Sequence, residues 1–146
     1  PAHGLDQECT VRMTGIIFSD LGQAASFMTL DWVQASLKQC LGFKPFPATL
    51  NVRPKSAEDG AVWRRAQHEL TALPLSPWDG GFCSARIYRI EILPPSSKAS
   101  EKIEGAVLLP EVQDYPNDKI EIVAPMRLKD HLGISDGDAL TLEFLN

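Results

Sequence analysis

Blocks of apolar and polar residues alternate along the chain, and each block predicts one element. Residues 11–18 (VRMTGIIF) are rich in apolar and β-branched side chains and end at the polar run 19–22, which predicts a strand followed by a loop. From Thr29, the predicted N-cap, apolar residues recur at helical spacing up to Leu41, and Gly42 follows as a stop signal. The first third of the chain is therefore expected to form a strand and a helix.

The middle of the chain predicts a short strand and a second, weaker helix. In the segment ATLNV, an extended backbone points Thr49 and Asn51 to one face and Leu50 and Val52 to the other. A helical pattern with acidic residues in its first turn follows over residues 56–70. Two neutral oxygen-bearing side chains are thus expected side by side on one face of the strand.

The C-terminal half has the pattern of a β-rich domain. Strands are predicted within residues 82–93, 105–109, 119–123 and 134–145, the last after a tight D-G turn. The polar segment 94–102 predicts a hairpin tip, and residues 125–132 suit a short helix. With at least five short strands, we expect a mainly-β domain closed into a barrel, because closure removes exposed strand edges.

Length and charge narrow the class of protein. The 146 residues suit one domain spanning 1–146, with residues 1–10 expected to be a loosely ordered N-terminal extension. The formal net charge of −5 disfavours nucleic acid and anionic membranes as partners, because binding to either relies on a basic surface. Neither a signal peptide nor an apolar stretch long enough for a membrane span is present, so we expect a cytoplasmic protein. The oligomeric state stays open.

Common short motifs do not identify a chemistry. The sequence contains no G-x-x-x-x-G-K-[ST], G-x-G-x-x-G, G-x-S-x-G or H-E-x-x-H pattern. Its three cysteines are far apart and without C-x-x-C, which predicts free thiols rather than disulfides or a zinc site. Its three histidines stand in unrelated contexts that favour surface roles.

Three blocks of the sequence nevertheless resemble one family in matching order. The segment LGFKPFPATLNVRP (41–54) is similar to the signature L-G-F-x-P-[YF]-x-G-T-L-N-[VL] of the archaeal-type CTP-dependent riboflavin kinases. Residues 103–144 resemble that family's C-terminal half, with G-A-[IV]-h-h-P (h is any apolar residue), E-I-[IV]-A-P and a D-G-D turn, and residues 78–92 resemble the strand before its polar hairpin. The resemblance covers roughly residues 14–145 and implies a small closed six-stranded barrel of the cradle-loop or swapped-hairpin type, with one or two short helices.

The resemblance also implies an activity and a cofactor. The family transfers the γ-phosphoryl group of CTP to the 5′-hydroxyl of riboflavin, giving FMN and CDP, and uses Mg²⁺. Residue by residue, its magnesium ligands correspond to Thr49 and Asn51. Neutral ligands suit Mg²⁺ here because the substrate phosphates supply the negative charge. A bare T-x-N pair is more often a strand and a turn residue, so the surrounding block carries this assignment.

Further site residues follow from the same resemblance. The family's nucleotide-contacting stretch at the start of a short helix corresponds to Met126, Arg127, Leu128 and Lys129. In this stretch the two basic side chains would offset phosphate charge, although they also suit a solvated surface helix. Glu121 corresponds to a flavin-contacting carboxylate and Gln113 to a flavin-contacting threonine. An outward-facing structural position suits Glu121 nearly as well, and it suits Gln113 better than a flavin contact, because there the residue type differs from the family's. Phe43, Phe46 and Tyr115 are available to cover the flavin ring or to pack in the core.

The chain departs from the family in its glycine-rich nucleotide loop. The family pattern S-G-L-G-E-G corresponds here to Ser19 followed by the predicted nucleotide-binding residues Asp20, Leu21, Gly22, Gln23, Ala24 and Ala25. Only one of the three glycines is present, and Ala24 in a left-handed conformation would cost ~1 kcal/mol or more. Ala48 also replaces the glycine before Thr49. As a compensating hypothesis, Asp20 serves as the catalytic base or as an additional Mg²⁺ ligand.

Two alternatives to a kinase stay open at this point. The altered loop is compatible with a non-catalytic flavin- or nucleotide-binding module of the same fold. The pattern L-x-x-x-L-G-I-x-D-G-D within residues 128–138 also resembles small DNA-binding swapped-hairpin barrels, although the acidic charge counts against DNA.

Overall fold

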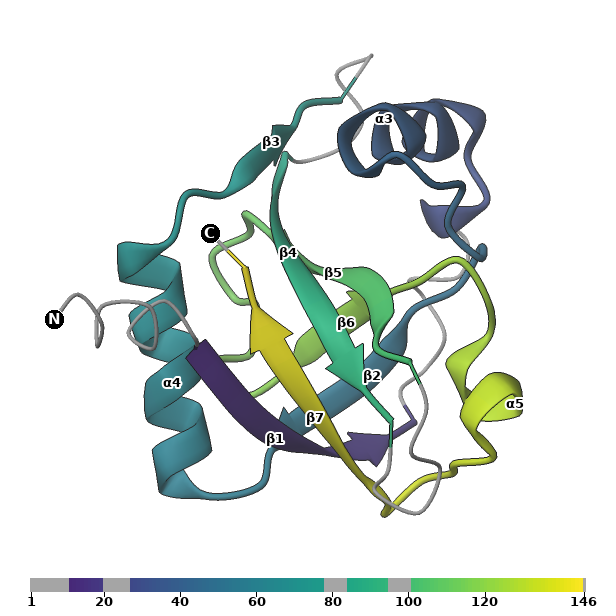
Figure 1. Ribbon diagram of the computed structural model, residues 1–146. Coiled ribbons are helices and arrows are strands. Elements are labelled where there is room, and N and C mark those ends of the chain that lie inside the picture. Colours follow the sequence, from purple (N-terminus) through teal and green to yellow (C-terminus); the bar gives the residue numbers. More distant parts are fainter. Residues whose placement is uncertain (1–10, 20–26, 78–83, 95–100, 146) are drawn as a thin grey trace, which may run out of the picture.

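Seven antiparallel strands form one sheet that closes on itself (Figure 1). The computed structural model describes residues 11–19, 27–77, 84–94 and 101–145. Within these residues the strands are β1 Val11–Phe18, β2 Leu50–Pro54, β3 Leu73–Leu75, β4 Ala85–Leu93, β5 Ile103–Pro110, β6 Ile120–Val123 and β7 Ala139–Phe144. The order β4-β5-β6-β2-β1-β7 forms a six-stranded ring because β7 pairs with both β1 and β4, and β3 adds to β4 outside the ring. The predicted mainly-β class and the closed six-stranded barrel are confirmed.

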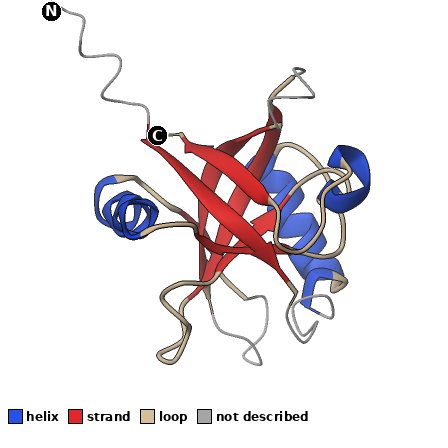
Figure 2. Cartoon of the chain, turned by 90° about the horizontal axis from the view of Figure 1, so that it is seen from below, coloured by secondary structure: helices blue, strands red, loops and turns tan. Residues whose placement is uncertain are grey.

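Helices lie on two sides of the barrel (Figure 2). The described residues contain α3 Asp31–Leu41, α4 Ala57–Glu69 and the short α5 Leu128–Leu132, which correspond to the three helical segments predicted from the sequence. Gly42 ends α3 with a left-handed φ of 84°, as predicted. The predicted N-cap at Thr29 is wrong: Leu30 occupies that position without a side-chain cap, and α3 begins at Asp31.

Helix α4 is fastened to the barrel by polar and aromatic contacts. Its N-cap Ser56 accepts a hydrogen bond from the Asp59 amide at 3.1 Å, and the Asp59 carboxylate accepts one from the Thr14 amide of β1 at 2.8 Å. Trp63 reaches into the barrel, where its ring stacks on Phe144 and meets Tyr88 edge-on. Because the ring is 2% exposed, α4 completes the core at this point.

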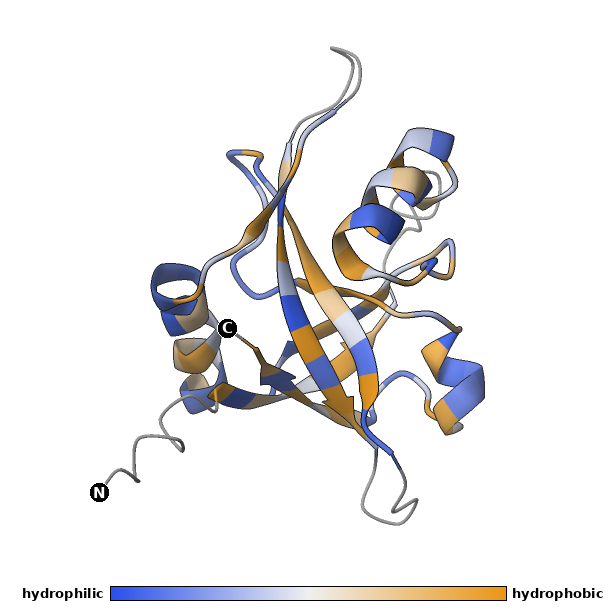
Figure 3. Cartoon of the chain, turned by 45° about the horizontal axis from the view of Figure 1, so that its top comes forward, coloured by the Kyte–Doolittle hydropathy of each residue, from blue (hydrophilic) through white to orange (hydrophobic). Residues whose placement is uncertain are grey.

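Apolar side chains form two separate clusters, and Figure 3 shows the hydrophobic stretches along the strands and the inner side of α3. The first fills the barrel and includes Ile17, Val52, Tyr88, Ile122 and Leu142. The second lies between α3 and the outer face of the barrel and includes Trp32, Leu37, Ile87, Leu108 and Val123. Strand β4 is therefore covered on both faces, and two consecutive residues, Ile87 and Tyr88, are buried where alternation within 82–93 predicted a half-buried strand.

Other differences from the predicted elements are small. Strand β3 was not predicted, and its three residues include a proline. Helix α5 begins at Leu128, three residues after the predicted start at Pro125. Most of the predicted hairpin tip 94–102 lies outside the described residues. No helix in the described ranges is long and apolar enough to cross a membrane.

An ion-pair network crosses the seam where the barrel closes. Arg12 of β1, Glu143 of β7 and Glu91 of β4 lie in one row of directly opposite residues. Glu143, 9% exposed, accepts hydrogen bonds from Arg12 at 3.2 Å and from Lys102 at 3.1 Å. Burial pushes the pKa of Glu143 upward, but these two cations outweigh it and hold the pKa below its ordinary value.

We expect Glu143→Gln to destabilise the fold by about 1–2 kcal/mol at pH 7, because two charge-assisted hydrogen bonds are lost from a buried position. A carboxylate with a lowered pKa stabilises the fold above its unfolded pKa, about 4.3, and that contribution disappears as pH falls through the folded pKa. The difference between the variant and the wild type should therefore shrink below about pH 4. Urea denaturation across this pH range measures it.

Glu104→Gln is the matched control. Glu104 of β5 lies directly opposite Glu91 of β4. It is exposed and forms no ion pair with any described residue. Its replacement should change the free energy of unfolding by less than about 0.5 kcal/mol. Equal effects of the two variants would contradict a role for the Glu143 ion pairs in closing the barrel.

Candidate functional site

A row of three side chains crosses the outer face of the barrel. Phe18 of β1 lies directly opposite Asn51 of β2, and Asn51 lies opposite Glu121 of β6. Directly opposite residues share a face, so these side chains are neighbours. Leu50 and Val52 point into the barrel core, as the predicted alternation requires.

The carboxylate of Glu121 is the centre of this row. Glu121 is only 5% exposed although it lies on the outer face. One carboxylate oxygen accepts a hydrogen bond from Thr49 Oγ1 at 3.4 Å, and the other accepts a short one from the Tyr115 hydroxyl. The fold thus brings the predicted metal ligands, Thr49 and Asn51, next to the predicted flavin contact Glu121, which is distant from both in the sequence.

Asn51 carries an unsatisfied oxygen at this place. Its Oδ1 is buried and accepts no hydrogen bond from any of the described residues. A buried acceptor without a donor costs about 1–3 kcal/mol, so such an atom calls for a partner such as a water or an ion. A cation satisfies an amide oxygen as a donor would, and oxygen is the ligand that Mg²⁺ prefers. The donor set of Thr49, Asn51 and the adjacent carboxylate therefore fits Mg²⁺.

A second polar group lies where β1 ends. The Lys129 ammonium is 2.9 Å from Asp136 Oδ1 and 3.5 Å from Ser19 Oγ, and Ser19 donates a hydrogen bond of 2.6 Å to Asp136 Oδ2. The turn that carries Asp136 is held against β1 because Gly137, with φ 94°, donates its amide to the Ile17 carbonyl at 2.8 Å. The described chain then stops at Ser19, directly before the predicted nucleotide loop.

The four residues of the predicted nucleotide-contacting stretch have different environments. Lys129 faces the end of β1, whereas the Arg127 guanidinium is exposed and pairs with Asp130 of its own helix at 2.7 Å. Leu128 is buried in the barrel core, and Met126 packs partly against that core. Of the four, Lys129 is therefore the one that contacts the end of β1 through described hydrogen bonds. The predicted residues Asp20, Leu21, Gly22, Gln23, Ala24 and Ala25 lie outside the described residues.

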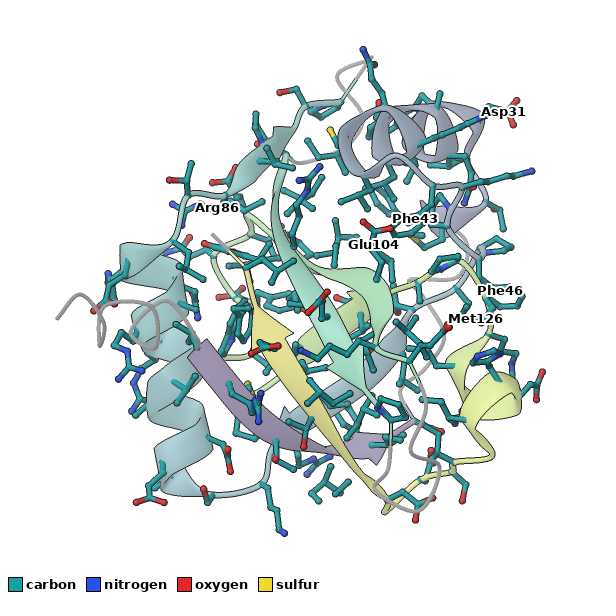
Figure 4. The ribbon with its side chains drawn as sticks, in the orientation of Figure 1. Asp31, Phe43, Phe46, Arg86, Glu104 and Met126 are labelled. Atoms are coloured by element: carbon teal, nitrogen blue, oxygen red, sulfur yellow. The ribbon has the colours of Figure 1, made fainter. Side chains whose placement is uncertain are left out.

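The predicted flavin contact Gln113 lies on another side of the barrel. With Tyr115, Arg86 and Trp63, it lines a hollow of about 490 Å³ between α4 and the segment 109–117. Figure 4 shows Arg86 toward α4 and, well separated from it, Met126 near α5. Tyr115 connects the two regions, since its ring borders the hollow while its hydroxyl contacts Glu121.

The other aromatic candidates serve packing in the described structure. Phe43 packs against the outer apolar cluster beneath α3. Phe46 donates its amide to the Ala124 carbonyl at 2.8 Å, and Figure 4 shows its side chain near that of Met126. Of the three aromatic residues suggested for the flavin, only Tyr115 contacts a predicted site residue through a described hydrogen bond.

Sequence reasoning missed Ser19 and Asp136 as members of the site. The D-G-D turn indicates only a tight reversal, because nothing in its local pattern reveals that it lies against the end of β1. Tyr115 was named only as a possible ring cover. Arg53 follows Asn51 by two residues on β2. The alternation that predicts the face of Asn51 therefore also predicts Arg53 on the outer face of the barrel.

The architecture defines a class of protein: a small closed β-barrel with an oxygen-lined, partly buried polar site on its outer face beside a basic residue. Comparison with known families then specifies that class. The family model described as "CTP-dep_RFKase: Domain of unknown function DUF120" matches residues 17–144, which is most of the chain. This protein belongs to that family of CTP-dependent riboflavin kinases, and the resemblance seen in the sequence is confirmed.

Curated archaeal proteins support the same assignment. A riboflavin kinase of Pyrobaculum islandicum is 31% identical over 137 residues, which cover 92% of this chain and 60% of that protein. A riboflavin kinase of Archaeoglobus fulgidus is 32% identical over 143 residues, covering 96% of this chain and 57% of the relative. The chain therefore spans about three fifths of the length of the relatives it matches.

We expect Ser19→Ala to raise the pKa of Asp136. The hydrogen bond from Ser19, followed by the contacts with Lys129, holds the pKa of this carboxyl below its ordinary value. Without the hydroxyl, the pKa should move up toward about 3.9. Carbon-detected NMR titration of the aspartate carboxyl groups measures the change.

Ser135→Ala is the control for this prediction, because its hydroxyl is next to Asp136 in the sequence but forms no hydrogen bond with a described residue. It should leave the titration of Asp136 unchanged. A pKa that stays low in Ser19→Ala would show that the contact at the end of β1 is not formed in solution.

Proposed function

We propose that this protein is a riboflavin kinase that uses CTP. In the reaction, the 5′-hydroxyl oxygen of riboflavin forms a bond to the γ-phosphorus, and the bond from that phosphorus to the β,γ-bridging oxygen breaks. CDP leaves with the electron pair, and the hydroxyl loses its proton to a base. The observation that carries the proposal is the convergence of Thr49, Asn51 and Glu121, all within the region that the family model matches.

Thr49 and Asn51 are proposed to hold Mg²⁺. The unsatisfied Oδ1 of Asn51 supports this, because it is a ready oxygen ligand within a buried setting. When bound, Mg²⁺ would offset the negative charge of the triphosphate. Glu121 adds one negative charge beside the site, and its oxygens are oriented by Thr49 and Tyr115. A carboxylate fixed in this way can accept hydrogen bonds from the ribityl hydroxyls of the flavin and hold the acceptor in line.

The nucleotide is assigned to the end of the barrel where β1 stops. Lys129 supports this assignment because it is joined to Ser19, the residue before the predicted loop 20–25. Arg127 would have to leave its exposed ion pair with Asp130 to reach a phosphate. Asp20 is proposed as the base that takes the proton of the hydroxyl. The preference for CTP over other triphosphates rests on the family alone.

The isoalloxazine ring is assigned to the hollow between α4 and the segment 109–117. Its volume of about 490 Å³ suits a flavin-sized ligand, and Tyr115 offers aromatic surface. Gln113, which also lines the hollow, supplies amide groups for the polar edge of the ring. Tyr115 links this hollow to Glu121, so a ribityl chain lying across that contact would connect the ring to the metal site.

The direct test incubates the purified protein with riboflavin, Mg²⁺ and each of the four nucleoside triphosphates, followed by chromatographic separation of the flavins. FMN formed with CTP, and not with the other three, is the expected result. In the same assay, Asp20→Ala should abolish turnover and leave riboflavin affinity intact. Riboflavin binding without product would instead identify a non-catalytic flavin module, and salt-sensitive DNA retention would favour the DNA-binding alternative.

Asn51→Leu separates the metal role from a structural role. Leucine has nearly the shape of asparagine, so removing an unsatisfied buried oxygen should leave the free energy of unfolding unchanged or higher in the absence of Mg²⁺. The variant should nevertheless lose FMN formation and the rise in melting temperature that Mg²⁺ with nucleotide gives the wild type. Thermal denaturation with and without both ligands measures this.

A large loss of stability in Asn51→Leu without ligands would contradict the assignment, because it would show that the amide is held by protein groups. Arg65→Met, which changes an exposed residue of α4, is the control for handling and purification. It should match the wild type in both FMN formation and ligand-induced stabilisation.

A further inference from the structure

Arg53 carries a cation next to the proposed metal ligands. It follows Asn51 by two residues on β2, so both side chains project from the outer face. Its guanidinium carbon lies 4.4 Å from the centre of the Phe18 ring, which is the geometry of a cation–π contact. Phe18 is directly opposite Asn51. The Arg53 guanidinium thus lies over Phe18, the cross-strand neighbour of Asn51, whose Oδ1 is unsatisfied.

Arg53 differs from the other basic residues near the site in its lack of an acidic partner. Lys129 pairs with Asp136 and Arg127 pairs with Asp130. Arg53 forms no ion pair with any residue in the part of the chain that the structure describes. Among the described residues, no acidic side chain competes with an anionic ligand for this guanidinium.

The position of Phe18 relates Arg53 to both halves of the site. Phe18 precedes Ser19, which contacts Lys129 and Asp136 at the proposed nucleotide end. On its other side Phe18 faces Asn51, which in turn faces Glu121. The guanidinium therefore lies over Phe18, the β1 residue that precedes Ser19 and faces the row formed by Asn51 and Glu121.

We propose that Arg53 binds the phosphoryl group that is transferred, as the γ-phosphate of the nucleotide before transfer and as the 5′-phosphate of the flavin after it. This inference rests on the proposed function and names a residue of the same site. A guanidinium donates two parallel hydrogen bonds to phosphate oxygens, which suits a group whose charge is redistributed during transfer. The Phe18 ring fixes the guanidinium in advance and so reduces the conformational entropy lost on binding.

The test compares the binding of two flavins that differ only in the phosphate. Dissociation constants of FMN and riboflavin are measured by flavin fluorescence in the presence of Mg²⁺ for the wild type, Arg53→Met and Arg53→Lys. Arg53→Met should weaken FMN binding about 10- to 100-fold and riboflavin binding less than about 3-fold, because only FMN loses a charge-assisted hydrogen bond. Arg53→Lys should recover part of the FMN affinity, since it keeps the charge and not the paired donors.

Kinetics and a charge control complete the design. Arg53→Met should lower kcat for FMN formation with little change in the KM for riboflavin, as expected for a contact made to the transferring group. Arg65→Met removes a cation from an exposed position on α4 and should leave the ratio of FMN to riboflavin affinity at the wild-type value.

Different results separate the possible failures. A lower melting temperature in Arg53→Met with an unchanged affinity ratio means that Arg53 only packs on Phe18, and this overturns the inference while the kinase proposal stands. A wild-type protein that neither binds flavin nor forms FMN overturns both. A wild type that binds flavin without turnover still supports the inference if Arg53→Met selectively loses FMN.

Discussion

The pairing of β7 with both β1 and β4 is the constraint on which the rest of the structure depends. Without it the sheet would be open, and β1 and residues 90–93 of β4 would present unpaired edges. Closure fixes the stagger of all six strands at once, because each strand has two neighbours that determine its register. The buried carboxylate of Glu143, with Arg12 and Lys102, adds a charged cross-link at the same seam.

Fixed register is also what assembles the site. Phe18, Asn51 and Glu121 belong to three strands and to distant parts of the sequence, and they meet only because β1, β2 and β6 pair in one alignment. A shift of one residue in β2 would turn Asn51 into the core and Val52 out to the surface. The polar site and the apolar interior are therefore two outcomes of one pairing pattern.

Much of the fold could be predicted from the sequence, because its signals are local. The strand over 11–18, the helix that stops at Gly42 and the helix over 56–70 follow from short-range spacing and turn residues. Strand β3 has only three residues and contains a proline, so no periodicity could reveal it. The consecutive burial of Ile87 and Tyr88 depends on α3 covering the outer face of β4, and such a tertiary contact leaves no local pattern.

The candidate site shows the same division. The faces of Thr49 and Asn51 follow from alternation, and the choice of these residues as ligands came from family resemblance. The contacts of Glu121 with Tyr115, and of Ser19 with Asp136, arise from loops folding back on strands, which sequence spacing does not encode.

The outer apolar cluster between α3 and the barrel also borders the candidate site. Leu108 of β5 lies directly opposite Glu121 and belongs to that cluster beneath α3, so the Glu121 side of the candidate site borders a second hydrophobic core. Substitutions in α3, even at positions remote from the candidate site, can therefore shift this carboxylate through the packing of the same outer face.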